Sequence, residues 1–446
     1  MRDWNAERVA GAAGADLLRD GDGGPSRVVI DSRSIAPGDL FVAIPGERVD
    51  AGRFAADALA AGAWGVLATP AWARTLDRGA VLAADDPVAA LGGLARGWRR
   101  ALGAQVIGVT GSVGKTSTKD LIAALIAPQR TVAASRANFN TEIGLPLELL
   151  AAPAGTEVLV LELAMRGFGQ IAELTAICEP DVGVITNVGP VHLEQMGSLE
   201  GVARAKAELL VGMRDGGVAV VPAGERLLDP YLRDALEVVT FGPGGDVRFA
   251  QEGSTTVLAG EERIELELPF ASRHNLTNTL AAVAAARAVG VTPHGHVDVA
   301  FGALRGERVV LARGATVVND CYNANPLSMR AALDDLATQE PAGRRVAVLG
   351  DMLELGPEEA AHHRAVGDRA RDAGVDVLIA VGPRSAAMLE TFGAGEAYAV
   401  ADAAAAAALA DEVVAAGDVV LVKGSRGVGL EVVAEALSAE RTGAGG

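Results

Sequence analysis

Lysine, cysteine and aromatic residues are all scarce in this 446-residue chain, and each shortage narrows what the protein can be. Only two cysteines occur, Cys178 and Cys321, which excludes a disulfide-rich framework and favours a reducing compartment. We interpret both as core or loop residues. Aromatic residues make up 4% of the chain while glycine and alanine are abundant, which favours closely packed helices on sheets.

Positive charge is also in short supply, since the formal net charge is −18 at pH 7. Surfaces that bind nucleic acid are basic, so this balance argues against a nucleic-acid partner, although a local positive site could still bind small anions. No apolar run is long enough to span a bilayer, and no charged-then-apolar leader precedes the first strands. The sequence therefore predicts a soluble, cytoplasmic protein without a membrane span.

Only four lysines occur, because arginine supplies the other 35 of the 39 basic residues. One of them, Lys115, lies in the run TGSVGKTST, between a predicted buried strand (106–109) and a predicted amphipathic helix (116–127). A glycine-rich turn in this position surrounds a phosphate with backbone N–H groups and one compact ammonium. Val109 stands where a standard P-loop has its first glycine, but the context is that of the motif. We therefore predict that ATP or a close relative binds to the loop Thr110, Gly111, Ser112, Val113, Gly114, Lys115, Thr116 and Ser117.

Three segments are distinguished along the chain, with boundaries expected at 1–85, 86–306 and 307–446. The first mixes short strands with an alanine-rich helix. The second contains continuous apolar strands, which are typical of parallel strands buried on both faces. The third alternates strands and helices regularly, which predicts a doubly wound sheet. The predicted fold is α/β with three domains: a small N-terminal α/β domain, a central P-loop domain with a parallel sheet, and a C-terminal Rossmann-like domain.

Candidate catalytic residues follow neighbouring strands of the second segment. Glu162 ends one predicted strand, and His192 follows the next. Because ligands bind beyond the carboxyl ends of parallel strands, both side chains and the phosphate loop are expected at one edge of the sheet. There the hydroxyl of Thr116 and the carboxylate of Glu162 would hold Mg²⁺ on the nucleotide. Taken singly, a solvated glutamate and a packed histidine are the ordinary alternatives.

The other lysines are interpreted with the same scarcity in mind. Lys206 lies in a predicted helix after His192, where a solvated charge is the ordinary reading. A primary amine can also react with CO₂ to form a carbamate, which could hold a second Mg²⁺. Lys119 fits a charge beside the phosphates or an ordinary helix residue equally well. Lys423, at the end of a C-terminal strand, is interpreted as an anion contact from the third domain.

Together these residues resemble the Mur ligase superfamily of ATP-dependent amide-forming enzymes. Folylpolyglutamate synthases share the short TGxxGKT loop, so that loop does not separate the members. The stretches NFNTEIGLPL, NVGPVHLE, SRHNLTN and NDCYNANPLSM, with VLGDMLELG and KGSRG after them, look like the branch that adds a dipeptide. The N-terminal DSRSIAPGDLFVAIPGERVD resembles the uridine-nucleotide domain of that branch. The resemblance covers almost the whole chain in the right order.

The resemblance implies a reaction and its cofactors. ATP would phosphorylate the terminal carboxylate of UDP-MurNAc-tripeptide, and the amine of D-alanyl-D-alanine would attack the acyl phosphate. Two Mg²⁺ ions are implied, the first held by Thr116 and Glu162 and the second by His192 with carbamylated Lys206. The implied catalytic set is Lys115, Glu162, His192 and Lys206. We expect a monomer.

Further residues are assigned by the match alone. Those expected near the nucleotide are Asn275, Asn278, Arg308, Asp320 and Asn323. Those expected near the two substrates are Ser32, Arg33, Asn138, Asn140, Thr141, Asn325, Asp351, Lys423, Ser425 and Arg426. Two departures from the family pattern occur. The family's Asp-Gly-His-x-Phe run reads Asp50-Ala51-Gly52-Arg53-Phe54 here, without the histidine, and Gly306-Glu307 precedes Arg308 where the family has a Gly-Arg pair.

Three alternatives stay open on the sequence. Another Mur-type or folylpolyglutamate-type amide ligase would differ only in its substrate. A non-catalytic relative would be expected to have lost at least one of the four catalytic residues, and all four are present. A P-loop kinase or transport ATPase is disfavoured by Val109 and by the second doubly wound domain. The third residue of the stem peptide, lysine or diaminopimelate, is not readable.

Overall fold

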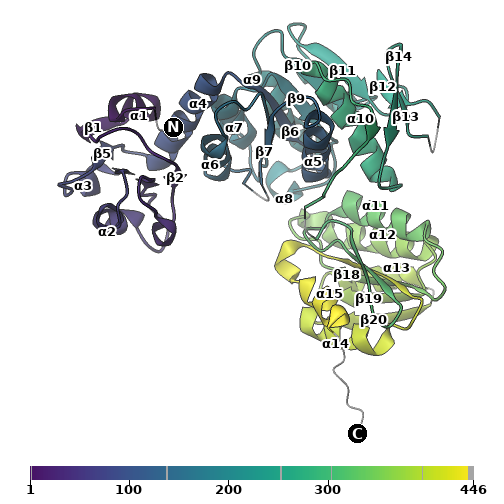
Figure 1. The fold of residues 1–446 in the computed structure, drawn as a ribbon. Coiled ribbons are helices and arrows are strands. Elements are labelled where there is room, and N and C mark those ends of the chain that lie inside the picture. The colour runs from purple at the N-terminus through teal and green to yellow at the C-terminus, as the bar shows by residue number, and fades with distance from the viewer. Residues whose placement is uncertain (2, 137–138, 252–253, 303, 394, 440–446) are drawn as a thin grey trace.

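Three sheets follow one another along the chain in the computed structural model, which describes all residues except 2, 137–138, 252–253, 303, 394 and 440–446 (Figure 1). The N-terminal sheet has the order β1-β5-β4-β3-β2 and is parallel except for β1. Its elements are α1 (Ala6–Ala13), β1 (Asp16–Arg19), β2 (Val28–Val29), β3 (Leu40–Val42), α2 (Ala55–Ala60), β4 (Gly65–Ala68), α3 (Pro70–Ala73) and β5 (Ala80–Ala83).

The central sheet has ten strands in the order β15-β14-β13-β12-β11-β10-β9-β6-β8-β7. Its strands are β6 (Gln105–Thr110), β7 (Val132–Ala134), β8 (Val158–Glu162), β9 (Val182–Ile185), β10 (Val218–Pro222), β11 (Glu237–Phe241), β12 (Val247–Phe249), β13 (Thr256–Ala259), β14 (Glu262–Glu267) and β15 (Gly295–His296). Its helices are α4 (Pro87–Leu102), α5 (Lys115–Ile126), α6 (Gly144–Ala151), α7 (Gln170–Cys178), α8 (Leu193–Met196), α9 (Leu199–Gly212) and α10 (Arg273–Ala288).

The middle of this sheet is buried on both faces, as the continuous apolar runs predict. β6, β8 and β9 are parallel neighbours. One apolar cluster packs α5 and α10 on one face, and another packs α4, α6, α7 and α9 on the other. The sheet is not parallel throughout, because β13 pairs antiparallel with β12 and β14. The alternating burial of β14 fits a strand with one face in solvent.

The C-terminal sheet has the order β16-β17-β21-β18-β19-β20 and is parallel except for β16. Helices cover both of its faces, in two separate apolar clusters. The elements are β16 (Glu307–Val310), β17 (Thr316–Asn319), α11 (Pro326–Ala337), β18 (Arg345–Gly350), α12 (Glu359–Asp372), β19 (Val377–Val381), α13 (Leu389–Phe392), β20 (Glu396–Val400), α14 (Ala403–Val413), β21 (Val419–Lys423) and α15 (Glu431–Ser438). The predicted three-domain α/β fold is confirmed.

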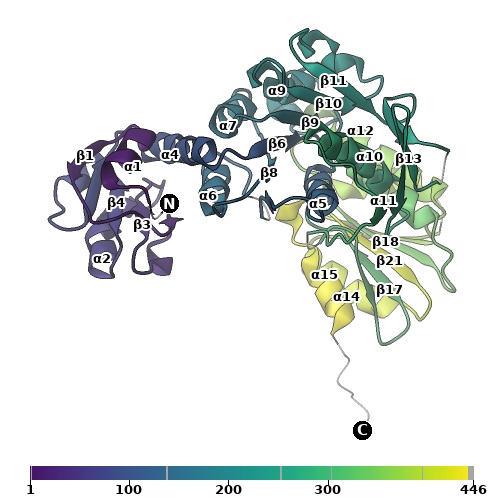
Figure 2. The ribbon, with the colours of Figure 1, turned by 45° about the horizontal axis from the view of Figure 1, so that its top comes forward.

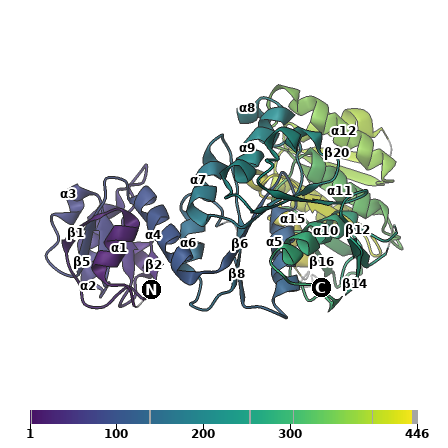
Figure 3. The same cartoon turned by 90° about the horizontal axis from the view of Figure 1, so that it is seen from above.

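Helix α4 joins the first two domains. Asp86 caps it by accepting hydrogen bonds from the backbone of Val88 and Ala89, Pro87 occupies its first turn, and Gly103 ends it with φ +66°. α4 packs against α1 on one side and against α6 and α7 on the other. Figures 2 and 3 show the N-terminal domain apart on one side, while the C-terminal domain lies against the central one. None of the helices in the described part of the chain is long and apolar enough to cross a membrane.

Candidate active site

The phosphate loop connects β6 to α5, and its shape requires two glycines. Gly111 has φ +154°, and a Cβ there would lie 1.8 Å from Thr186 Oγ1. Gly114 has φ +79°, and a Cβ there would lie 2.6 Å from Asn278 Oδ1. Asn187, which follows β9, accepts a hydrogen bond from the Val113 backbone N–H at 3.0 Å through Oδ1. Neighbouring strands therefore fix the loop before any ligand binds.

Lys115, the first residue of α5, folds back over this loop. Its Nζ donates to the Gly111 carbonyl oxygen at 2.9 Å. Burial lowers the pKa of Lys115, the nearby Glu162 carboxylate opposes that shift, and Arg305 adds to it. The ammonium is thus held where a phosphate oxygen could replace the carbonyl as its partner.

Glu162, at the end of β8, is the carboxylate beside the loop and is 3% exposed. Thr116 Oγ1 donates to its Oε2 at 2.6 Å, and Asn140 Nδ2 donates to its Oε1 at 2.9 Å. Both carboxylate oxygens are therefore oriented by neighbouring side chains. Asn140, assigned from the sequence to a substrate, contacts Glu162 here.

The other two predicted catalytic residues, His192 and Lys206, come from the part of the chain that follows β9. His192 directly precedes α8 with φ +51°, and its Nδ1 lies 2.5 Å from Glu354 Oε2. Burial lowers the pKa of His192, and Glu354 opposes that shift. Lys206, on α9, is 2% exposed, and its Nζ has no hydrogen-bond or ion-pair partner among the described residues. Burial, reinforced by Lys115, lowers the pKa of Lys206 well below its ordinary value, which favours the neutral amine.

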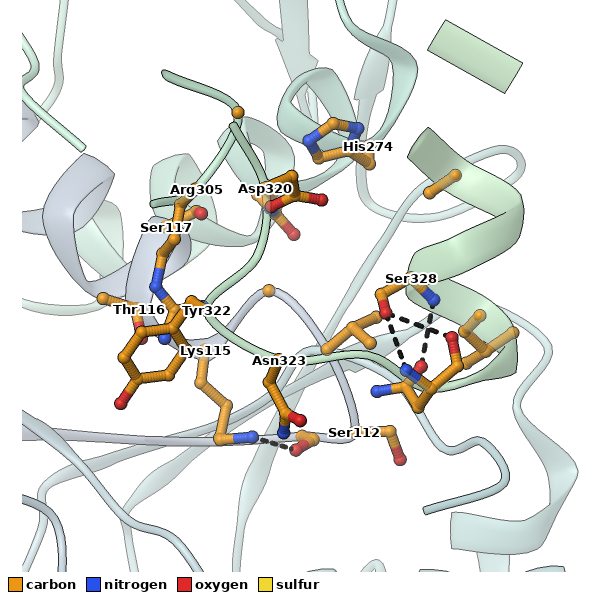
Figure 4. Close-up of a pocket in the computed structure, with 18 of the residues that line it drawn as sticks. Ser112, Lys115, Thr116, Ser117, His274, Arg305, Asp320, Tyr322, Asn323 and Ser328 are labelled. Carbon is orange, nitrogen blue, oxygen red and sulfur yellow. Dashed lines mark hydrogen bonds between the residues drawn. The ribbon is translucent and has the colours of Figure 1, made fainter. Parts of the chain in front are cut away.

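These residues share one cavity of about 1100 Å³ between the central and C-terminal domains. All eight loop residues from Thr110 to Ser117 line it, with Glu162, His192 and Lys206. Figure 4 shows side chains from both domains around it: Lys115 and Thr116 from the central domain, and Asp320, Tyr322 and Asn323 from the C-terminal domain. The structure thus brings the four predicted catalytic residues together.

The cavity is also lined by all five of the further residues assigned to the nucleotide. Asn275 and Asn278 lie on α10 beside the loop, and Arg308, on β16, donates to Gln339 Oε1. Sequence reasoning missed Arg305, whose guanidinium lies 4.0 Å from the ring centroid of Tyr322. It also missed Glu354. The sequence feature that could have identified Arg305 is its position next to Gly306, at the predicted boundary between the second and third domains.

Lys423, interpreted from the sequence as an anion contact, has its partners within its own domain. Its side chain is 3% exposed, and its Nζ donates to Asp320 Oδ2 at 2.6 Å and to the carbonyls of Asp320 and Asn323 at 3.3 and 3.0 Å. The ammonium therefore fastens the loop after β17, and because Lys423 also lines the cavity, its contact with an external anion stays a prediction. Asn325 likewise uses its side chain locally, since it caps α11 by accepting from the Ser328 N–H at 2.9 Å.

Other predicted substrate residues are not brought to this cavity. Ser32 and Arg33 lie in the N-terminal domain, where Arg33 pairs with Asp31 at 2.8 Å. Asp351 accepts from the N–H groups of Arg384 and Ser385, and neither it, Ser425 nor Arg426 is among the described residues that line the cavity. Thr141 does line it. Asn138 lies outside the described residues.

The donor sets differ in how well they suit a metal ion. The described residues contain no group of three or more His, Cys, Asp or Glu side chains placed to hold one. A nucleotide-bound Mg²⁺ needs only one or two protein oxygens, because phosphates and water complete its shell. Thr116 and Glu162 fit that requirement. His192 and unmodified Lys206 offer nitrogen only, so a hard cation would fit there once Lys206 carried a carbamate.

Comparison with known proteins agrees with this geometry. Profiles of the Mur ligase family match in chain order: its catalytic domain over residues 26–89, its middle domain over 109–286 and its glutamate ligase domain over 304–426. The chain belongs to the Mur ligase family.

Within that family it groups with the UDP-N-acetylmuramoyl-tripeptide–D-alanyl-D-alanine ligases. The ligase of that name from Bacillus subtilis is 38% identical over 358 residues, which cover 76% of each chain. A crystal structure of MurF from Acinetobacter baumannii superposes with a TM-score of 0.87 at 30% identity, covering 98% of this chain and 99% of that one. The MurF ligase of Thermotoga maritima, solved in complex with ADP, gives a TM-score of 0.80 at 30% identity, with 92% and 97% covered.

Proposed function

We propose that this protein joins D-alanyl-D-alanine to UDP-MurNAc-tripeptide, consuming ATP and releasing ADP and phosphate, in the synthesis of the peptidoglycan precursor. The observation that carries the proposal is the Thr116–Glu162 pair beside Lys115 in a cavity shared by two domains. That arrangement places phosphate-binding and carboxylate groups where a second domain can deliver an acceptor. The named relatives supply the identity of the substrates.

The reaction has two steps. An oxygen of the tripeptide's terminal carboxylate attacks the γ-phosphorus of ATP, the bond to the bridging oxygen breaks, and ADP leaves. The amine nitrogen of the dipeptide then attacks the acyl carbon and loses a proton, and phosphate leaves with the oxygen that the carboxylate contributed. Lys115 and the loop N–H groups stabilise the negative charge on the transferred phosphoryl group.

The proposal includes two Mg²⁺ ions, which would neutralise charge on the phosphates. Thr116 and Glu162 would hold the first. His192 and carbamylated Lys206 would hold the second. The burial of Lys206, which lowers the pKa of its amine, supports this, since only the neutral amine adds CO₂.

The domains have separate proposed roles, and we retain 1–85, 86–306 and 307–446 as their boundaries. Ser32 and Arg33 would contact the uridine nucleotide, and Thr141, Asn140 and Asn138 the peptide. In the C-terminal domain, Asp351, Ser425 and Arg426 would approach the dipeptide after closure, as Asn325 and Lys423 were also expected to do. We further propose that the protein acts as a monomer in the cytoplasm.

The test is phosphate release by the purified protein with ATP, Mg²⁺, UDP-MurNAc-tripeptide and D-alanyl-D-alanine, leaving out each component in turn. We expect release only with the complete mixture, with a pentapeptide product by mass spectrometry. Release that does not need the dipeptide would identify a different acceptor. No release would support a non-catalytic relative, and supplying lysine or diaminopimelate tripeptides would define the third residue.

A further inference from the structure

Glu354 contacts the active site from the other domain. It lies in the loop between β18 and α12, and its Oε2 is 2.5 Å from Nδ1 of His192 in the central domain. The two side chains are 41% and 27% exposed, a setting in which an ion pair alone contributes little. The contact between Glu354 and His192 therefore matters only if the surrounding structure holds both side chains in place.

Both backbones are held in an unusual conformation. Glu354 has φ +62° and His192 has φ +51°, and these are two of the four non-glycine residues with positive φ in the described part of the chain. Such a conformation costs on the order of 1–3 kcal/mol for each residue and persists where the surroundings impose it. The two loops meet closely, since a Cβ at Gly356 would lie 3.6 Å from the Glu194 backbone.

The loop that carries Glu354 is anchored at the two residues directly before it. The Met352 N–H donates to Nε2 of the fully buried His363 at 3.0 Å. The Leu353 N–H donates to Ser425 Oγ, also at 3.0 Å. The carboxylate of Glu354 is thus presented by a backbone that is hydrogen-bonded just before it, and the next side chain, Leu355, is buried.

The loop that carries His192 is anchored to the phosphate loop. Ser112 Oγ donates to the Gly189 carbonyl at 3.0 Å and accepts from the Gly189 N–H at 2.9 Å. His192 follows three residues later and lines the cavity with Lys115 and Lys206. A change in the orientation or protonation of the His192 ring would therefore alter the active site itself.

A carboxylate at Nδ1 decides which ring nitrogen carries the proton. A carboxylate can only accept, so Nδ1–H donates to Glu354, and in the neutral ring Nε2 then keeps its lone pair. Carboxylates that orient an imidazole in this way act on the ligand or base that the other nitrogen provides. We propose that Glu354 is a positioning residue for His192, which fixes its tautomer and ring orientation only when the C-terminal domain is docked.

This inference rests on the proposed function for its kinetic test, but its first test does not. In the full chain labelled with ¹⁵N-histidine, we expect the His192 ring to show a protonated Nδ1 and an unprotonated Nε2. Glu354→Ala should give a mixture of tautomers, while Glu354→Gln, whose amide oxygen still accepts, should keep the wild-type signal. Unchanged ring signals in Glu354→Ala would overturn the proposal.

The second test is a double-mutant cycle in the ligase assay. Glu354→Ala should lower kcat by about 10–100-fold, the range found for groups that orient metal ligands, and should cost nothing further in a His192→Ala background. An equal loss in both backgrounds would show that Glu354 does not act through His192. Glu358→Ala is the matched control, since that exposed carboxylate four residues later has no side-chain partner among the described residues and should leave both readouts unchanged. A protein with no ligase activity would refute the proposed function alone, because the tautomer test would still stand.

Discussion

Lys423 and Asp320, which both line the cavity, form a charged pair with 2.6 Å between Nζ and Oδ2. The lysine comes from the end of β21 and the aspartate from the residue after β17, two adjacent parallel strands. The pair therefore connects the two strands whose ends support the 320–323 loop. The same lysine also donates to two backbone carbonyls of that loop.

Lys423→Met should destabilise the C-terminal domain by about 2 kcal/mol, because hydrogen bonds to a charged group are lost and Asp320 is left without its partner. Urea unfolding followed by circular dichroism would measure this change, since all four tryptophans lie outside the C-terminal domain. Asp320→Asn keeps an acceptor oxygen and should cost less. A variant with normal stability but a raised KM for the dipeptide would show instead that Lys423 contacts the substrate.

Glu162→Gln should lower kcat by about 10²–10³-fold, the range for loss of one group that stabilises a transition state. The amide keeps the shape and can still accept from Thr116, but it loses the negative charge proposed to hold Mg²⁺. ADP formation would be measured at several Mg²⁺ concentrations. Glu173→Gln, an exposed carboxylate on the same cavity wall, is the control. An unchanged kcat for Glu162→Gln would remove Glu162 from the mechanism.

Lys206→Met should stabilise the protein in CO₂-free buffer. The pKa of Lys206 is depressed in the folded protein, so unfolding takes up a proton at any pH between the folded and unfolded pKa values. The cost of burying this amine therefore grows as the pH falls below 10.5, the ordinary pKa of a lysine side chain. The gain from Lys206→Met should be larger at pH 7 than at pH 10 in denaturant titrations.

Lys119 provides the comparison for that experiment. It is also buried, but its Nζ donates to the Ser135 carbonyl at 2.5 Å and pairs with Asp120 at 2.8 Å. Lys119→Met should therefore lose stability where Lys206→Met gains it. If Lys206→Met were also destabilising at pH 7, the amine would have partners that its burial does not suggest.

Both cysteines should resist modification while the protein is folded. Burial raises the pKa of Cys178 to about 12 and that of Cys321 to about 11, so little thiolate exists at pH 8. A disulfide reagent that releases a coloured thiol should react with both only after denaturation. Rapid reaction of one thiol in the native protein would show that the segment around it opens readily, which is the loop after β17 for Cys321 and α7 for Cys178.

The sequence predicted well wherever local pattern and strand order decide the outcome. The apolar runs at β6, β8 and β9 identified parallel neighbours, and that placed Lys115, Glu162 and His192 at one edge. It failed where a contact depends on packing between distant segments. Neither the Glu354 contact to His192 nor the use of Lys423 within its own domain can be read from spacing, because 162 residues separate the first pair and 103 the second.

The most direct test of the central claim follows one oxygen atom. UDP-MurNAc-tripeptide labelled with ¹⁸O in its terminal carboxylate would be incubated with ATP, Mg²⁺, D-alanyl-D-alanine and the enzyme in unlabelled water, and the released phosphate analysed by mass spectrometry. An acyl-phosphate route predicts one ¹⁸O atom in each phosphate released. Unlabelled phosphate would mean that the protein hydrolyses ATP without activating the carboxylate, which would contradict the ligase account.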